Sequence, residues 1–169
     1  AERWNAYARR LPAPASLNVF EVRGRQLKGV VVLDAEFVFA LVDIFFGGPG
    51  KATRPVSLVE FTPMETRLVR KFVGTVLADL REAWKPFMDL DCQLGATEVN
   101  PVFAAVAAAS EPMTVQTVDL GVAGREFSFD VVLPGSLVEP IRFLRDAGAN
   151  RRDNDPGRWE ARLKADVQD

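Results

Sequence analysis

The sequence has no histidine among its 169 residues and a single cysteine, Cys92. Without histidine the chain cannot build a histidine-ligated zinc site, nor the Ser-His-Asp and Cys-His arrangements of nucleophilic hydrolases. With one cysteine it cannot form an internal disulfide, so the reducing interior of a cell is the compartment we expect. The inventory of residues therefore excludes these classes of site.

Long apolar runs are also lacking, since none approaches the roughly 20 residues of a membrane-spanning helix. The chain starts with Ala1-Glu2-Arg3-Trp4, without a signal-peptide core or an initiator methionine, so we expect it to be a fragment of a longer protein. Its 21 basic and 23 acidic residues nearly cancel, which argues against nucleic-acid binding. A hydrophobic content of 48% is typical of a globular domain.

The first half of the chain predicts a β-hairpin followed by a helix. Apolar-rich runs at 17–23 and 27–33 flank a glycine-containing turn. Asp34 is placed to cap a helix whose apolar residues recur at spacings of three and four as far as Phe45. The helix then runs into a glycine-rich loop at 47–50, where glycine can end it and proline prevents its restart.

This glycine-rich loop has two explanations. The ordinary one is a helix C-cap followed by a surface loop. The other is contact with a partner, because Gly48, Pro49 and Gly50 leave the backbone almost uncovered. In that case we expect the loop to be mobile in the free domain and ordered when the partner binds.

A long helix is predicted from Pro63 to Trp84. Thr62 and Glu65 have the spacing of a capping box, and Pro63 suits the first helical position. The predicted core stripe has one row at every fourth residue and a second row beside it: Met64, Leu68, Phe72, Val76, Leu80 and Trp84, widened by Val69, Val73 and Leu77. Gly74 inside the helix suggests that another element packs against the backbone there.

The second half predicts a strand, an irregular connection, a second hairpin and another helix. Alternating residues at 89–99 indicate the strand, in which Cys92 is interpreted as a buried filler. The alanine-rich segment at 104–109 lies between prolines and is expected to be irregular. Runs at 113–120 and 125–133 predict the hairpin, and a further capping box predicts the helix after it.

The two hairpin-plus-helix units form an internal repeat with a constant offset. The matching positions are Val32-Leu33, Phe37, Leu41 and Ile44 in the first unit, and Val132-Leu133, Leu137, Ile141 and Leu144 in the second. Two ββα units joined by a long helix predict an α/β domain with pseudo-twofold symmetry, in which a mostly antiparallel sheet lies in α/β/α layers. We expect a lead-in segment at 1–16, this domain at 17–148, and a linker with a partial helix toward a missing domain at 149–169.

Several short motifs occur in an order and spacing that is specific in combination. They are Tyr7 with Leu11–Asn18, Phe46–Gly50, Glu60–Thr62 with Glu65, Asn100-Pro101, Leu133-Pro134 and Val138–Ile141. Together they resemble the middle domain of the FliM family of flagellar motor switch proteins, over nearly the whole chain. The resemblance implies a CheC-like pseudosymmetric fold, in agreement with the internal repeat.

The resemblance implies a rotor component that is not an enzyme and needs no cofactor. Members of the family stand between FliG and FliN in the cytoplasmic ring of the flagellar basal body, on the inner face of the membrane and without insertion into it. They pack beside neighbouring FliM copies and convert the binding of phosphorylated CheY into a change of rotation direction during chemotaxis. FliN is implied as a partner through the missing C-terminal domain.

In the family, a Gly-Gly-x-Gly loop contacts FliG. The matching positions here are Gly47, Gly48, Pro49 and Gly50. The resemblance therefore implies a FliG-binding loop at these residues, and their neighbours Phe46 and Arg54 are expected to support it.

Two enzymatic interpretations compete with this one. A phosphate-binding loop is excluded because Ala52 stands after Lys51 where serine or threonine is required, and because the glycines follow a helix. CheC-type relatives are phosphatases of phosphorylated CheY that present a glutamate and an asparagine one turn apart on an exposed helix face. The expected helices at 35–46, 63–84 and 137–147 contain no asparagine, so this alternative is disfavoured.

Close pairs of like charges are interpreted as solvated residues at the ends of elements. Asp89 with Asp91, and Asp153 with Asp155, are poor candidates for metal ligands for this reason. The arginines at 9–10 lack the interleaved aromatic residues of a nucleic-acid surface. No metal or nucleic-acid site is therefore expected.

Overall fold

A computed structural model describes residues 1–51, 60–122 and 124–153. The chain divides into two compact units, Ala1–Gly135 and Ser136–Asp169. The first contains one sheet and its covering helices, and the described part of the second belongs to the helix α5 (Gly135–Asp153). No helix in the described ranges combines the length and the apolar character needed to cross a bilayer.

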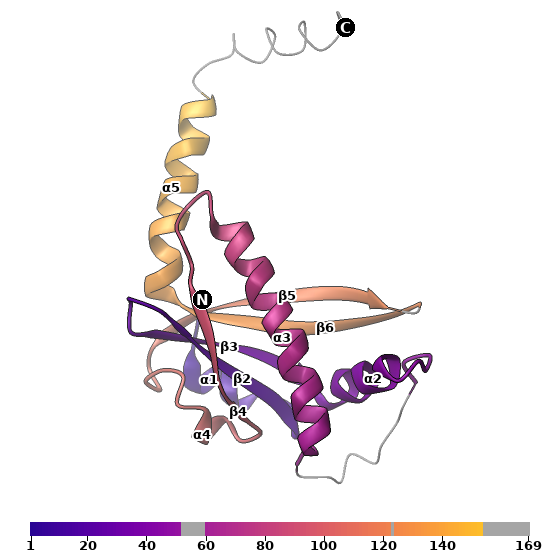
Figure 1. The fold of residues 1–169 in the computed structure, drawn as a ribbon. Coiled ribbons are helices and arrows are strands. Elements are labelled where there is room, and N and C mark those ends of the chain that lie inside the picture. The colour runs from indigo at the N-terminus through magenta and orange to yellow at the C-terminus, as the bar shows by residue number, and fades with distance from the viewer. Residues whose placement is uncertain (52–59, 123, 154–169) are drawn as a thin grey trace, which may run out of the picture. The chain divides into compact units, whose positions relative to one another are not determined.

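The sheet of the first unit has six strands in the order β1-β5-β6-β3-β2-β4 (Figure 1). The strands are β1 (Glu2–Arg3), β2 (Ala15–Val22), β3 (Leu27–Asp34), β4 (Cys92–Glu98), β5 (Pro112–Val122) and β6 (Arg125–Pro134). The helices are α1 (Trp4–Arg9), α2 (Ala35–Phe45), α3 (Pro63–Trp84) and α4 (Pro101–Ala104). Every recorded strand pairing is antiparallel, which confirms the predicted fold class.

The internal repeat appears in the sheet as a pseudo-twofold axis between β3 and β6. These two strands pair at the centre, and Val31 lies opposite Val131 in their register. The two valines are separated by 100 positions, the offset that also relates Leu33 to Leu133. Residues that are equivalent in the repeat therefore face each other on the axis, and the hairpins β2–β3 and β5–β6 lie on either side.

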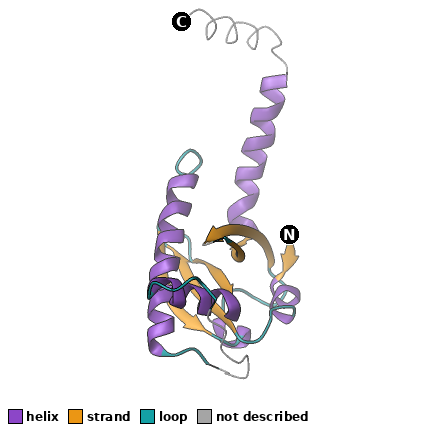
Figure 2. Cartoon of the chain, turned by 90° about the vertical axis from the view of Figure 1, so that its right-hand side faces the viewer, coloured by secondary structure: helices purple, strands orange, loops and turns teal. Residues whose placement is uncertain are grey.

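Helices cover both faces of the sheet. On one face Phe37 of α2 packs against Phe72 of α3 and Phe127 of β6, with ring centroids 5.4 and 5.3 Å apart. On the other face Trp4 and Tyr7 of α1 join Ala104 of α4 in a second buried cluster. Figure 2 shows α3 on one side of the sheet and the N-terminal segment on the other. The α/β/α layering is therefore as predicted.

α3 begins and ends where the sequence predicts. Thr62 Oγ1 accepts the Glu65 N–H at 3.2 Å, and Glu65 Oε2 accepts the Thr62 N–H at 2.8 Å, which completes the capping box. The stripe is phased differently from the prediction, because its centre follows Val69, Val73 and Leu77 while Met64 is 57% exposed. Successive residues in a row at every fourth position are displaced by about 40° around the helix axis. The first and last residues of a long row therefore face away from the core.

The prediction for Gly74 was wrong. A Cβ built at this position would meet nothing within 4 Å, and the residue is exposed. The glycine is therefore not required by the packing of another element.

The long helix is joined to the sheet by a polar network around buried Asn18. The Asn18 amide donates to Ser16 Oγ at 3.1 Å and to the Val31 carbonyl at 3.3 Å, and its Oδ1 accepts the Thr97 hydroxyl at 3.0 Å. Arg70 of α3 then donates to Thr97 Oγ1 at 3.0 Å. Buried polar groups are thus satisfied, as a stable core requires.

The connection after β4 is partly different from the prediction. The strand is shorter than 89–99, and the one-turn helix α4 follows it, capped by Asn100 Oδ1, which accepts the Val102 N–H at 2.9 Å. Ala105 then adopts a left-handed φ of 44°, and no regular element forms before β5. The prolines at 101 and 112 bound this irregular segment as expected.

The predicted lead-in segment at 1–16 contributes β1, α1 and the first two residues of β2, and its Trp4 and Tyr7 are buried. The expected helix after the second hairpin is confirmed as α5, which continues to Asp153. The division of the chain at residues 16 and 148 stays a prediction.

Candidate partner-binding loop

α2 ends in a Schellman motif at the first two glycines of the loop. Phe46 is the C-cap, and Gly47 follows with a left-handed φ of 85°. The Gly47 N–H donates to the Ile44 carbonyl at 2.9 Å, and the Gly48 N–H donates to the Asp43 carbonyl at 2.8 Å. The ordinary C-cap explanation therefore accounts for Gly47.

The rest of the loop folds around the carboxylate of Asp43. Asp43 Oδ2 accepts the Gly50 N–H at 2.8 Å and the Lys51 N–H at 3.1 Å. A Cβ at Gly48 would overlap the same carboxyl group, so only glycine fits at that position without a rearrangement. The Asp43 side chain thus binds the backbone N–H groups of Gly50 and Lys51 and fills the space beside Gly48.

Arg125, at the start of β6, holds the far end of the loop. Its Nη1 donates to the Gly50 carbonyl at 2.5 Å, and its Nη2 pairs with Glu36 Oε1 of α2 at 3.1 Å. The guanidinium also lies over the ring of Phe127, with Cζ 5.2 Å from the ring centroid. Gly50 is buried and has a left-handed φ of 76°, which explains glycine at this position.

Two aromatic side chains and a proline form the exposed part of the site. Phe45 and Phe46 are 56% and 65% exposed, and their rings are 5.8 Å apart in an edge-on arrangement. Pro49 is exposed at the tip, and Lys71 of α3 lies over the Phe45 ring at 5.6 Å. We name Phe45, Phe46 and Pro49 the loop surface; it is apolar and has a cation at its edge.

The structure brings five of the six predicted site residues together: Phe46, Gly47, Gly48, Pro49 and Gly50. Arg54 lies outside the described residues. Sequence reasoning missed Asp43 and Arg125. An acidic residue in the last turn of a helix is unfavourable for the helix dipole, and this was a usable signal for Asp43. Arg125 is 75 positions from Gly50 and left no such signal.

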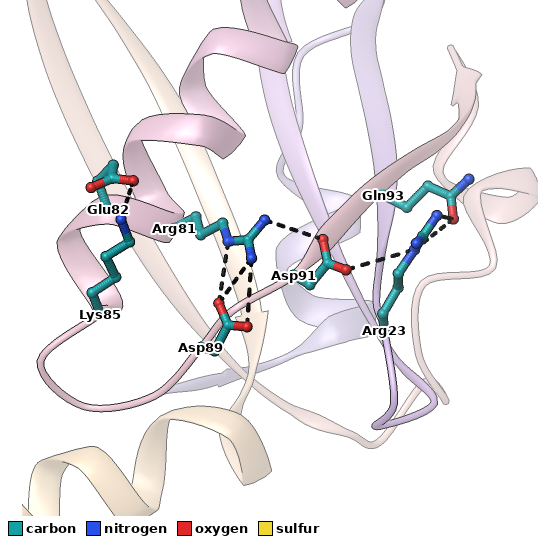
Figure 3. A network of polar contacts seen from close by, with 7 residues as sticks. All are labelled: Arg23, Arg81, Glu82, Lys85, Asp89, Asp91 and Gln93. Carbon is teal, nitrogen blue, oxygen red and sulfur yellow. Dashed lines mark hydrogen bonds and ion pairs between the residues drawn. The ribbon is translucent and has the colours of Figure 1, made fainter.

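Asp89 and Asp91, which were rejected as metal ligands, form an exposed ion-pair network instead (Figure 3). Asp155 and the side chain of Asp153 lie outside the described part of the chain. Arg81 of α3 contacts Asp89 at 3.1 Å and Asp91 at 3.7 Å, and Arg23 of the β2–β3 turn lies 3.9 Å from Asp91. Arg23 also donates to Gln93 at 2.9 Å. Among the described residues no cluster of cysteine and acidic side chains could hold a metal ion.

Cys92 is half-buried. Burial raises the pKa of its thiol to about 11, and the neighbouring charge of Asp91 acts in the same direction. The thiol therefore stays protonated near neutral pH, in agreement with a packing role for this residue.

Comparison with known proteins gives a consistent result. A family profile described as flagellar motor switch protein FliM matches residues 1–145. FliM of Pseudomonas aeruginosa is 34% identical over 168 residues, covering 99% of this chain and 52% of that protein. FliM of Escherichia coli is 29% identical, covering 98% of this chain and 50% of that protein. The chain thus spans about half the length of these curated relatives.

Solved structures agree with the sequence comparison. The crystal structure of the FliM middle domain from Vibrio alginolyticus superposes with a TM-score of 0.71 at 34% identity, over 85% of this chain and 79% of that chain. FliM in a FliG–FliM complex from Helicobacter pylori has the same fold, with a TM-score of 0.72 at 22% identity over 79% of this chain and 72% of that chain. With a family profile over most of its length and this fold, the chain belongs to the flagellar motor switch protein FliM family.

Proposed function

We propose that this chain acts in the flagellar motor switch as an interaction domain that binds FliG through the loop surface. The observation that carries the proposal is the exposure of Phe45 and Phe46 beside Pro49, on a loop whose glycines are all explained by the chain's own structure. Large aromatic side chains left in water next to a fixed backbone are typical of an interface. Arg54 is proposed as a further support of this contact.

The other partners follow from membership of the family. We propose that the domain packs against neighbouring FliM copies, that phosphorylated CheY acts on the whole protein to change the direction of rotation, and that FliN binds through a domain outside this chain. The proposed location is the cytoplasmic side of the flagellar basal body. The solved FliG–FliM complex from Helicobacter pylori supports the choice of FliG as the partner for the first test.

A CheC-type phosphatase is the alternative, and we propose that the domain has no such activity. α5 is longer than expected and includes Asn150, but Glu139, the glutamate of that helix, is eleven positions earlier. The two positions are about three helical turns apart in the sequence, whereas such a pair requires a spacing of one turn. α2 and α3 contain no asparagine.

The proposal is tested by calorimetric titration of the chain with FliG. We expect Phe46→Ala to weaken binding by ~2 kcal/mol, because an exposed aromatic residue at the centre of an interface contributes at this scale. Phe103→Ala is the matched control: Phe103 is 69% exposed on α4, which packs on the opposite face of the sheet. Equal affinities of both variants and the original chain would contradict the proposal.

Pro49→Ala is the second variant, since Pro49 is exposed and has no backbone N–H, so its replacement removes no hydrogen-bond donor from the loop. Gly48 is less suitable for this test, because any side chain there also displaces the Asp43 carboxylate. A loss of affinity in Pro49→Ala and Phe46→Ala, with unchanged circular dichroism, supports direct contact through the loop surface.

A further inference from the structure

We infer that Asp43 and Arg125 are positioning residues that fix the glycine-rich loop in its binding conformation before any partner arrives. This inference rests on the proposed function, because it concerns the loop that presents the FliG-binding surface. It adds two residues to the site, one from each half of the repeat, neither of which belongs to the glycine motif itself.

The contacts of Asp43 are suited to hold a loop. Its side-chain hydrogen bonds go to the backbone N–H groups of Gly50 and Lys51, at 2.8 and 3.1 Å. Hydrogen bonds to an ionised acceptor are about twice as strong as those between neutral groups. A single carboxylate in the last turn of α2 therefore closes the loop back onto the helix that it leaves.

Gly48 and the Asp43 carboxylate fit each other. The Gly48 N–H is satisfied by the main-chain carbonyl of Asp43, and the carboxyl group occupies the position of a side chain at residue 48. The second glycine of the motif is thus explained by the need to admit this carboxylate. The loop is a closed turn around a fixed group.

Arg125 attaches the same loop to the second half of the repeat. Its guanidinium is oriented by the Phe127 ring and by Glu36, and it reaches the Gly50 carbonyl from the start of β6. In Figure 1 the tip of the β5–β6 hairpin lies near the end of α2. Gly50 is consequently held on both sides, with its N–H on Asp43 and its carbonyl on Arg125.

A loop held in this way loses little conformational freedom when it binds. Ordering a flexible segment reduces affinity, and preorganisation removes that cost. The sequence alone predicts the opposite, a loop that is mobile until a partner orders it. The two descriptions differ in the exchange behaviour of two backbone amides.

Amide hydrogen exchange of the full chain, followed by NMR, distinguishes them. We expect the Gly50 and Lys51 amides to be protected in the original chain and to exchange about tenfold faster or more in Asp43→Ala, because each loses a charged acceptor. The Gly48 amide is an internal control, since it donates to the main chain of Asp43 and keeps its partner. Asp119→Ala, which removes an exposed carboxylate on β5, is the matched control.

FliG titration gives the functional readout. We expect Asp43→Ala and Arg125→Gln to weaken binding about tenfold, which is the scale of one lost charge-assisted hydrogen bond. Asp119→Ala, which removes an exposed carboxylate on β5 that takes no part in the loop contacts, should leave the affinity unchanged. Asp43→Asn keeps the shape of the side chain, so it tests the loss of charge if Asp43→Ala does not fold.

Each outcome has a definite meaning. Unprotected Gly50 and Lys51 amides in the original chain overturn the inference. So does a loss of FliG affinity in Asp43→Ala without faster exchange of these amides, because Asp43 would then touch the partner directly. If the original chain does not bind FliG while the exchange pattern is as expected, the proposed function fails and the two residues still fix the loop.

Discussion

Tyr7 is the only tyrosine in the chain, and its side chain is fully buried. Its hydroxyl donates to Asp130 Oδ2 at 2.9 Å, and Asp130 Oδ1 accepts the Thr117 hydroxyl at 2.7 Å. One aromatic side chain therefore ties α1 to both strands of the β5–β6 hairpin.

The environment of Tyr7 predicts how stability depends on pH at the alkaline end. Burial, followed by the charge of Asp130 and its hydrogen bond, raises the pKa of Tyr7 well above its ordinary value of about 10. The folded chain therefore keeps a proton that the unfolded chain releases above about pH 10, so the unfolding free energy decreases as the pH rises through that range. Ultraviolet titration should show phenolate only as the domain unfolds.

The titration has a simple control, because Tyr7→Phe removes the absorbance change altogether. The same substitution leaves Asp130 with one hydroxyl partner fewer. A reversible ionisation step near pH 10 with unchanged circular dichroism would show that the Tyr7 hydroxyl reaches solvent in the folded chain, contrary to its burial.

The glycine-rich turn that ends α2 could be predicted because the conformations that end a helix are local, while the partner-binding role of its residues stays a prediction. Gly47 and Gly50 both have positive φ, as the motif suggests. Arg125 was missed because its contact with Gly50 is tertiary. Asp43 was missed although its contacts with Gly50 and Lys51 are local and its place in the last turn of α2 was a signal. The requirement for glycine at position 48 could not be predicted from the motif alone, because it depends on where the Asp43 carboxylate lies.

At the scale of elements, the sequence predicted the helix boundaries that are determined by residues close by in the chain. Both ends of α3 agree with its capping box and with Pro86, and the start of α2 agrees with Asp34, whose Oδ1 accepts the Phe37 N–H at 2.7 Å. The phase of the α3 stripe and the helix α4 could not be predicted in the same way. Both depend on which neighbouring surface the segment packs against.

Gly74 gives a test at this scale. Because a Cβ there would meet nothing within 4 Å, we expect Gly74→Ala to stabilise the domain by about 1 kcal/mol through helix propensity alone. Urea unfolding followed by circular dichroism measures the change. Gly29→Ala is the contrasting variant, since a Cβ at Gly29 overlaps the Phe20 ring and should destabilise the domain. A destabilised Gly74→Ala variant would mean that a partner surface or an alternative packing needs this glycine.

At the scale of the whole molecule, the repeat predicted two matching hairpins in one sheet, and the β3–β6 pairing is the result. The positions of the outer strands, β1 and β4, could not be predicted from the sequence. β1 has only two residues in register with β5, and β4 joins β2 through an irregular register. The two outer pairings occupy corresponding places on either side of the β3–β6 axis, but β1 and β4 lie outside the two ββα units whose sequences match, so comparing those units could not indicate either pairing.

The central position of β3 and β6 predicts that the first unit unfolds as a whole. Val31 and Val131 are buried opposite each other, and the two halves of the repeat meet at this pair. We expect Val31→Ala and Val131→Ala each to cost about 2–3 kcal/mol, from lost burial and an incompletely filled cavity. The loss should affect both halves equally, because neither hairpin has a separate core.

Fluorotryptophan labels observed by fluorine NMR can test this in a single sample. Trp4 reports on the face covered by α1, and Trp84 reports on the end of α3. Coincident loss of their native signals with urea is the mark of a cooperative transition, and each valine variant should move both midpoints together. Asp119→Ala serves as an exposed control that should move neither. Loss of the Trp4 signal at a lower urea concentration than the Trp84 signal would show instead that α1 and α3 leave their faces of the sheet in separate steps, contrary to a single cooperative transition.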